Sequence, residues 1–129
     1  MKENPKEAEL LNPSIRFMLM VHEAVPGITE TVLNAGRTTD GRSSYEILRD
    51  AAELLAGQTV VDLACGSGCL TELLVELVGT DGKVIGIDLS PDELALAQHR
   101  LHGIEGVEFL RESACHLSLP SASVDAVLC

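Results

Sequence analysis

The chain has 129 residues, of which 46% are hydrophobic and 22% are charged, and its net charge is −11. This length and apolar content predict one folded domain and exclude a disordered chain. The acidic balance disfavours binding to nucleic acid or to an anionic membrane surface. Apolar runs fall far short of the roughly 20 residues of a membrane helix. The polar start MKENPKEAEL does not resemble a signal peptide, so we expect a cytoplasmic protein.

The first 57 residues predict a helical lead. Asn12-Pro13-Ser14 starts a helix that Pro26-Gly27 ends, and a shorter helix covers 28–33. Residues 34–42 predict a mobile loop. Ser43 and Glu46 then match a capping box for a third helix, which Gly57 ends. The helical spacing of Phe17, Met18 and Met20 favours core packing over an acceptor pocket. We expect ordinary surface or packing roles for the remaining polar candidates of the chain, His22, Arg42, Tyr45, His99, His102 and His116.

Residues 58–129 predict strands that alternate with helices. An apolar β-branched run at 59–64 leads into a glycine loop at 65–68 and a helix through Leu77. A second strand at 83–89 precedes a helix that Ser90-Pro91 opens and Gly103 ends. Further strands follow at 107–111 and 124–129. This order predicts the α/β class, with a doubly wound parallel sheet and helices on both faces.

The glycine loop and an acid after the second strand form the candidate site. Gly66 and Gly68 allow close backbone approach at the carboxyl end of the first strand, beside a helix N-terminus. Asp88 lies twenty residues beyond Gly68, where a carboxylate can bind ribose hydroxyls. Thr71 stands where a dinucleotide fingerprint has its third glycine, and no lysine follows the glycines. An adenosyl ligand without pyrophosphate therefore fits better than a dinucleotide or a nucleoside triphosphate.

The four cysteines offer no disulfide framework. They lack the density of a disulfide scaffold and the paired CxxC spacing of a zinc site, so we expect reduced thiols and no metal. The alternative is a zinc cluster of Cys65, Cys69, Cys115 and His116.

Three segments carry a family resemblance. VVDLACGSG (60–68), VIGIDLSP (84–91) and LSLPSASVDAV (117–127) resemble class I S-adenosylmethionine-dependent methyltransferases of the small-molecule and quinone type. The resemblance covers about residues 45–129 and implies a Rossmann-like sheet of seven strands with the order 3-2-1-4 for the first four. Because the chain stops at the fourth strand, we expect a fragment with the C-terminal strands missing, divided into a lead or lid (1–57) and a truncated cofactor-binding half (58–129). An uncovered edge at Val124, Val127 and Leu128 would favour self-association or strand swapping.

The resemblance also implies the cofactor contacts. Asp62 would hold the ammonium group, Gly66 and Gly68 would admit the amino acid moiety, and Asp88 would bind the ribose. Leu89 and Ala114 would contact the adenine. Two positions depart from the family pattern, because Ala64 replaces the first glycine of the loop and Ser113 replaces the acid near the adenine amino group. The expected cofactor-binding set is Asp62, Ala64, Cys65, Gly66, Ser67, Gly68, Asp88, Leu89, Ser113 and Ala114.

The sequence thus predicts the cofactor-binding part of a methyltransferase. The expected acceptor is an O, N or C atom of a small molecule, and no catalytic residue is assigned. One alternative is a non-catalytic adenosyl-binding or assembly module that a partner chain completes. Another is a nicotinamide-dependent oxidoreductase, against which Thr71 argues.

Overall fold

A computed structural model describes residues 13–129 of the chain. It contains a four-stranded parallel sheet with the strand order β3-β2-β1-β4, which confirms the predicted α/β class and order. The elements are α2 (Pro13–Ala24), α3 (Ile28–Ala35), α4 (Ser44–Ala51), β1 (Thr59–Leu63), α5 (Cys69–Val78), β2 (Lys83–Asp88), α6 (Pro91–Arg100), β3 (Val107–Arg111) and β4 (Ala126–Leu128).

The two faces of the sheet are covered differently. On one face, Val60 and Val84 pack against Leu70 and Leu74 of α5, and α4 extends this cluster. On the other face, Val61, Ile85 and Ile87 are buried with Leu119 and Val124 of the irregular segment between β3 and β4. A helix was predicted on both faces, but an irregular segment covers the second face in the part of the chain that the structure describes.

The glycine loop between β1 and α5 depends on close packing with α6. Gly68 has a φ of +85°, and a Cβ placed there would lie 3.1 Å from the Cβ of Ala97. Only glycine combines this left-handed backbone with so close a neighbour. The start of α6 is fixed as predicted, because the hydroxyl of Ser90 accepts a hydrogen bond from the backbone N–H of Glu93 and Pro91 is the first helical residue.

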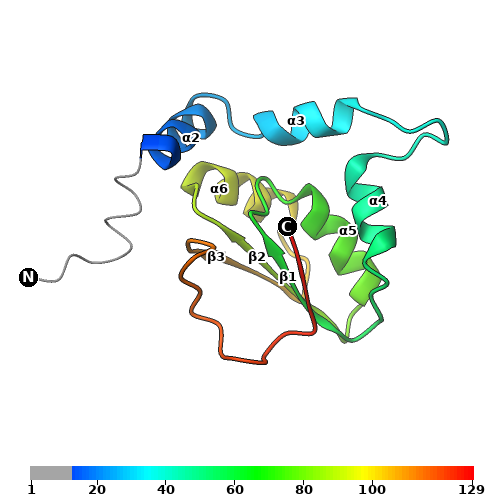
Figure 1. Ribbon diagram of the computed structural model, residues 1–129. Coiled ribbons are helices and arrows are strands. Elements are labelled where there is room, and N and C mark those ends of the chain that lie inside the picture. The colour runs from blue at the N-terminus through cyan, green and yellow to red at the C-terminus, as the bar shows by residue number, and fades with distance from the viewer. Residues whose placement is uncertain (1–12) are drawn as a thin grey trace, which may run out of the picture.

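Helices α2 and α3 lie across the carboxyl end of the sheet (Figure 1). The prediction that Phe17, Met18 and Met20 form part of the core is wrong, because their exposed fractions are 60%, 51% and 57%. Helical spacing places residues on a common face, but α2 has no second layer of described chain against which to bury that face. Among residues 13–129, no helix is both long and apolar enough to cross a membrane.

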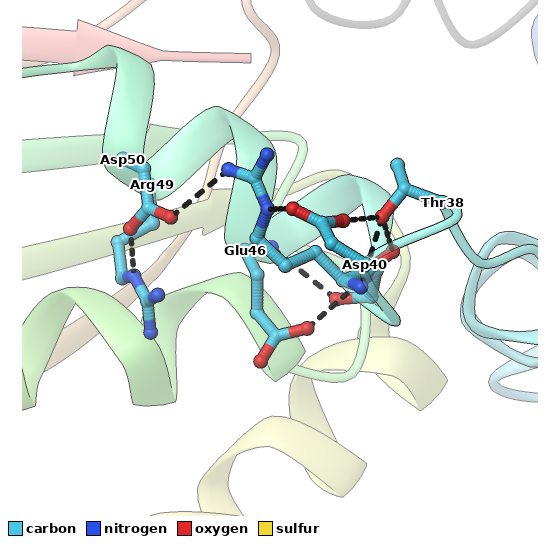
Figure 2. A network of polar contacts seen from close by, with 7 residues as sticks. Thr38, Asp40, Glu46, Arg49 and Asp50 are labelled. Carbon is cyan, nitrogen blue, oxygen red and sulfur yellow. Dashed lines mark hydrogen bonds and ion pairs between the residues drawn. The ribbon is translucent and has the colours of Figure 1, made fainter.

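The capping box at the start of α4 forms as predicted. The backbone N–H of Ser43 donates to Glu46, and the N–H of Glu46 donates back to the Ser43 hydroxyl. The preceding loop is tied to this helix by Arg42, whose guanidinium contacts Asp40 and Asp50 in the network of Figure 2. The helix ends at Ala51 and not near Gly57, because the chain turns after it and Glu53 adopts a left-handed φ of 50°.

The fourth strand is shorter than the predicted 124–129. Val127 is 55% exposed, as expected for an uncovered strand. Leu128, by contrast, is only 6% exposed, because it packs into the cluster with α5. Val124 is also partly buried, against the cluster of Val61, Ile85 and Ile87. The expectation that Val124 and Leu128 lie uncovered is therefore wrong, whereas self-association of the chain stays a prediction.

Candidate cofactor site

Two adjoining cavities lie at the carboxyl ends of β1 and β2. The first has a volume of about 340 Å³ and is enclosed by α2, the end of β2 and residues 112–114. The second has a volume of about 330 Å³ and is enclosed by α2, α3, α4 and the glycine loop. Each is within the size range of small-ligand sites. The residues that line both cavities are Met18, His22, Leu63, Ala64 and Asp88.

Asp88 connects the cavities to the glycine loop. Its Oδ2 accepts the backbone N–H of Gly66 at 2.9 Å, and its Oδ1 accepts the backbone N–H of Ser90 at 2.8 Å. Each carboxylate oxygen has a second lone pair. Asp88 can therefore hold the loop and the start of α6 while it accepts hydrogen bonds from hydroxyl groups in the cavity.

Asp62 is a deeply buried acid among the predicted site residues. It is 2% exposed, lines the second cavity, and accepts a 2.6 Å hydrogen bond from the hydroxyl of Thr71. Burial raises its pKa to about 6, and the nearby carboxylates of Glu30 and Asp88 add to this rise, whereas the Thr71 bond opposes it. Thr71 stands at the position where a dinucleotide fingerprint would have its third glycine. Its hydroxyl group instead donates a hydrogen bond to the buried Asp62.

The loop residues divide between the cavities and the protein interior. Ala64 and Gly66 line the second cavity together with Cys65, whose thiol pKa is raised mainly by burial. Ala64 has a φ of 61°, a left-handed conformation that favours glycine, which is the residue of the family pattern at this position. Gly68 packs against α6, and Ser67 is buried with its carbonyl accepting a hydrogen bond from Arg100, so neither lines these two cavities.

The predicted adenine contacts lie together in the first cavity. Leu89, Ser113 and Ala114 line it with Ile87 at the end of β2. The hydroxyl of Ser113 accepts the backbone N–H of Cys115 at 3.2 Å, so this side chain shapes the turn after β3.

Two buried glutamates at the site were not predicted. Glu30 of α3 is 6% exposed and accepts the backbone N–H of Cys69 at 3.0 Å, so it serves as the side-chain cap that Gly68 cannot supply to α5. Glu93 of α6 is 2% exposed and accepts the backbone N–H of Gly27 at 2.7 Å. In one bond α5 donates to the lead, and in the other the lead donates to α6, so that together the two bonds fix α3 over the glycine loop. The burial of Glu93 in the first turn of α6 had no signal in the local sequence.

His22 and Tyr45 of the lead also line the second cavity. The Nδ1 atom of His22 lies 4.0 Å from Glu93 Oε1, and its Nε2 lies 3.3 Å from the hydroxyl of Thr29. Burial and the neighbouring Glu30 raise the pKa of Tyr45 to about 12. Surface or packing roles were expected of His22 and Tyr45, and the structure places both in the lining of the second cavity.

Metal ligands are not assembled in the described part of the chain. No group of three or more histidine, cysteine, aspartate or glutamate side chains within residues 13–129 is placed to hold a metal ion. The four cysteines are free, with Cys65 buried and Cys115 exposed. The alternative zinc cluster of the sequence analysis is thus not formed.

Comparisons with known proteins agree with this geometry. Residues 60–129 match the family model described as a methyltransferase domain. The 2-phytyl-1,4-naphtoquinone methyltransferase of Thermosynechococcus vestitus is 41% identical over 73 residues, which are 57% of this chain and 32% of that protein. The chain therefore spans about a third of the length of that relative.

Solved structures extend the comparison to three dimensions. An S-adenosylmethionine-dependent methyltransferase from Aquifex aeolicus aligns with a TM-score of 0.60 at 29% identity, over 65% of this chain and 46% of that one. Phosphoethanolamine N-methyltransferase 1 of Haemonchus contortus aligns with a TM-score of 0.70 over 93% of this chain and 25% of that one. At 23% identity this second likeness concerns the fold alone, although it includes the lead helices. The family match covers more than half of the chain, which therefore belongs to the class I S-adenosylmethionine-dependent methyltransferase family.

Proposed function

We propose that this chain binds S-adenosylmethionine and forms the cofactor-binding part of a methyltransferase that acts on an O, N or C atom of a small molecule. The observation that carries this proposal is the pair of cavities joined at Asp88 and bordered by the glycine loop. The first cavity has an apolar slot for a base, and the second has backbone and carboxylate groups for an amino acid moiety. The family membership of residues 60–129 supports the same assignment.

The residues present fit this cofactor. Gly66 has no side chain, and a Cβ there would lie 3.5 Å from Glu30 Oε1, so the loop leaves space that another residue would occupy. The free lone pairs of Asp88 suit the two ribose hydroxyls, and Asp62 suits the ammonium group. Leu89 and Ala114 offer apolar contact to the adenine. Ser67 and Gly68 line neither cavity, and we propose that they contribute to cofactor binding by shaping the loop.

When bound, the cofactor supplies an electrophilic methyl group for in-line displacement. The contribution of this chain is to orient the cofactor and to exclude water, because alignment of acceptor and methyl can supply most of the acceleration. Helices α2, α3 and α4 act as the cover, since α2 lines both cavities and α3 and α4 line the second. Free cysteines support a reducing, cytoplasmic location.

Calorimetric titration with S-adenosylmethionine, with NAD as the control ligand, tests this proposal. Saturable binding of S-adenosylmethionine alone is expected. Asp88→Ala is a poor probe because Asp88 also holds Gly66 and Ser90. Ala114→Trp is sharper, since Ala114 is exposed and lines the first cavity, so the larger side chain fills the slot without disturbing the core.

Ala95→Trp provides the matched control, because Ala95 is exposed on α6 and lines neither cavity. The proposal predicts that Ala114→Trp abolishes binding and that Ala95→Trp preserves it. Binding of NAD in preference to S-adenosylmethionine, or equal binding by the two variants, would contradict it.

A further inference from the structure

The lining of the two cavities has an unusual charge. Among the described residues that line them, five are acidic and none is lysine or arginine. His22 is the only basic side chain in this set. The acids are Glu30, Asp62, Asp88, Glu93 and Glu112. The charged side chains that a ligand in these cavities meets are therefore predominantly acidic.

Three of these carboxylates converge on one residue of the glycine loop. A methyl group placed on Gly66 would lie 3.5 Å from Glu30 Oε1 and 3.8 Å from Glu93 Oε2. Asp88 Oδ2 lies 2.9 Å from the backbone nitrogen of the same residue. Gly66 lines the second cavity, where the amino acid moiety of the cofactor is proposed to bind, and the cofactor sulfur joins that moiety to the ribose proposed at Asp88. The converging acids therefore face this half of the cofactor.

Burial makes these charges effective. Glu30 and Glu93 are 6% and 2% exposed, so water screens them weakly. Their backbone hydrogen bonds to Cys69 and Gly27 fix the carboxylates in place. Burial raises the pKa of Glu93, and the charges of Glu30 and Asp88 add to the rise, although the Gly27 bond and His22 oppose it. The acids thus repel one another, and a cation that enters the cavity would relieve that repulsion.

The neighbouring cations do not cancel this charge. Arg100 Nη2 lies 3.8 Å from Glu30 Oε2, but Arg100 is absent from the lining of both cavities and also contacts Glu72 and the carbonyl of Ser67. His22 Nδ1 lies 4.0 Å from Glu93 Oε1. Arg100 and His22 therefore offset part of the charge of Glu30 and Glu93, but neither cavity has a lysine or arginine side chain in its described lining.

The reaction changes the charge of the cofactor by one. The acceptor lone pair forms a bond to the methyl carbon, and the electron pair of the breaking S–C bond returns to sulfur, so the sulfonium cation becomes a neutral thioether. Building on the proposed function, we propose that Glu30 and Glu93 are specificity-determining residues that make the site bind the sulfonium cofactor more tightly than its thioether product. Loss of the positive charge then favours release of S-adenosylhomocysteine.

The first test uses the unaltered chain and three ligands. Calorimetry compares S-adenosylmethionine, S-adenosylhomocysteine and sinefungin, in which a carbon bearing a protonated amine replaces the methylated sulfur. Both cations are expected to bind at least about tenfold more tightly than the thioether, since each adds a charge near buried carboxylates. Equal or tighter binding of the thioether would overturn the inference without affecting the proposed function. Failure of all three ligands to bind would overturn both.

The second test removes one charge at a time. Glu30→Gln and Glu93→Gln keep an oxygen that can accept the bonds from Cys69 and Gly27. Each variant is expected to reduce the preference for the cationic ligands about three- to tenfold. Binding of the two cationic ligands is expected to weaken, whereas binding of the thioether is expected to stay unchanged. Glu72→Gln is the matched control, because Glu72 also contacts Arg100 but lies outside both cavities. If a variant bound all three ligands more weakly by the same factor, the replaced glutamate would have a purely structural role, and the inference would be overturned.

Discussion

The buried carboxylate of Asp62 destabilises the fold at neutral pH, and Asp62→Asn is expected to raise stability while it weakens cofactor binding. Asp62 is 2% exposed, and its pKa rises from 3.8 to about 6. Because this pKa is raised, the folded chain binds the proton more tightly than the unfolded chain does. Stability from this group is therefore greatest at low pH and falls as the pH rises through about 4 to 6.

The magnitude follows from the pKa. A rise from 3.8 to about 6 corresponds to a cost of about 3 kcal/mol above about pH 7, of which about 1 kcal/mol remains at about pH 4.5. The asparagine amide keeps one acceptor for the Thr71 hydroxyl and loses about 1 kcal/mol of charge-assisted hydrogen bonding. The net gain for Asp62→Asn is about 2 kcal/mol at about pH 7.5 and close to zero at about pH 4.5.

Urea unfolding measures this difference directly. The chain has no tryptophan, so far-ultraviolet circular dichroism is the appropriate signal. Asp81→Asn is the matched control, since Asp81 is exposed in the turn before β2 and its replacement is expected to change stability little at either pH. If Asp62→Asn lowered stability at about pH 7.5, or changed it equally at both pH values, the account of a buried ionised carboxylate would be refuted.

The other predictions concern the loop and its thiol. Ala64→Gly is expected to stabilise the fold by about 0.5–1 kcal/mol in the same assay, because relief of a left-handed alanine exceeds the added chain entropy, and a loss of stability would contradict this. Gly68→Ala is expected to destabilise by about 2–3 kcal/mol, because a methyl group would meet Ala97 at 3.1 Å on a strained backbone; an unchanged urea midpoint would refute this. A thiol reagent at about pH 8 is expected to modify exposed Cys115 quickly and Cys65 only on unfolding, since burial raises the pKa of the Cys65 thiol, and mass spectrometry of the labelled peptides gives the order.

Features set by a few neighbouring residues were predictable from the sequence. The capping box of Ser43 and the start of α6 at Ser90 each need only residues within one helical turn, and both form as predicted. The parallel sheet follows from apolar runs separated by helices, and its strand order follows from the family resemblance. Helix ends were less predictable, because α4 ends at Ala51, shortly before a left-handed Glu53, and no glycine or proline marks this end.

Features that depend on a neighbouring layer were not predictable. The apolar spacing of α2 matches a core helix, yet Phe17 is exposed. This exposure could not be predicted, because a single sequence does not state how many layers of structure cover a helix. Met18 has the same helical spacing, yet it is half exposed and lines both cavities. The choice between core and pocket depends on tertiary contacts that spacing alone does not encode.

The acids around the glycine loop show why a motif describes only part of this site. Asp62 and Asp88 occur at fixed positions after two strands, so the sequence indicates them. Glu30 and Glu93 reach the loop through contacts between residues 39 and 66 positions apart, to Cys69 and Gly27 respectively. Each buried acid costs stability unless a partner compensates for it. The described chain compensates mainly with the backbone N–H groups of Cys69 and Gly27, which keep the negative charge, while Arg100 and His22 contact Glu30 and Glu93 at 3.8 and 4.0 Å. This choice of partner makes the cavity attractive to a cation, and the sulfonium of the proposed cofactor is the cation that fits the family.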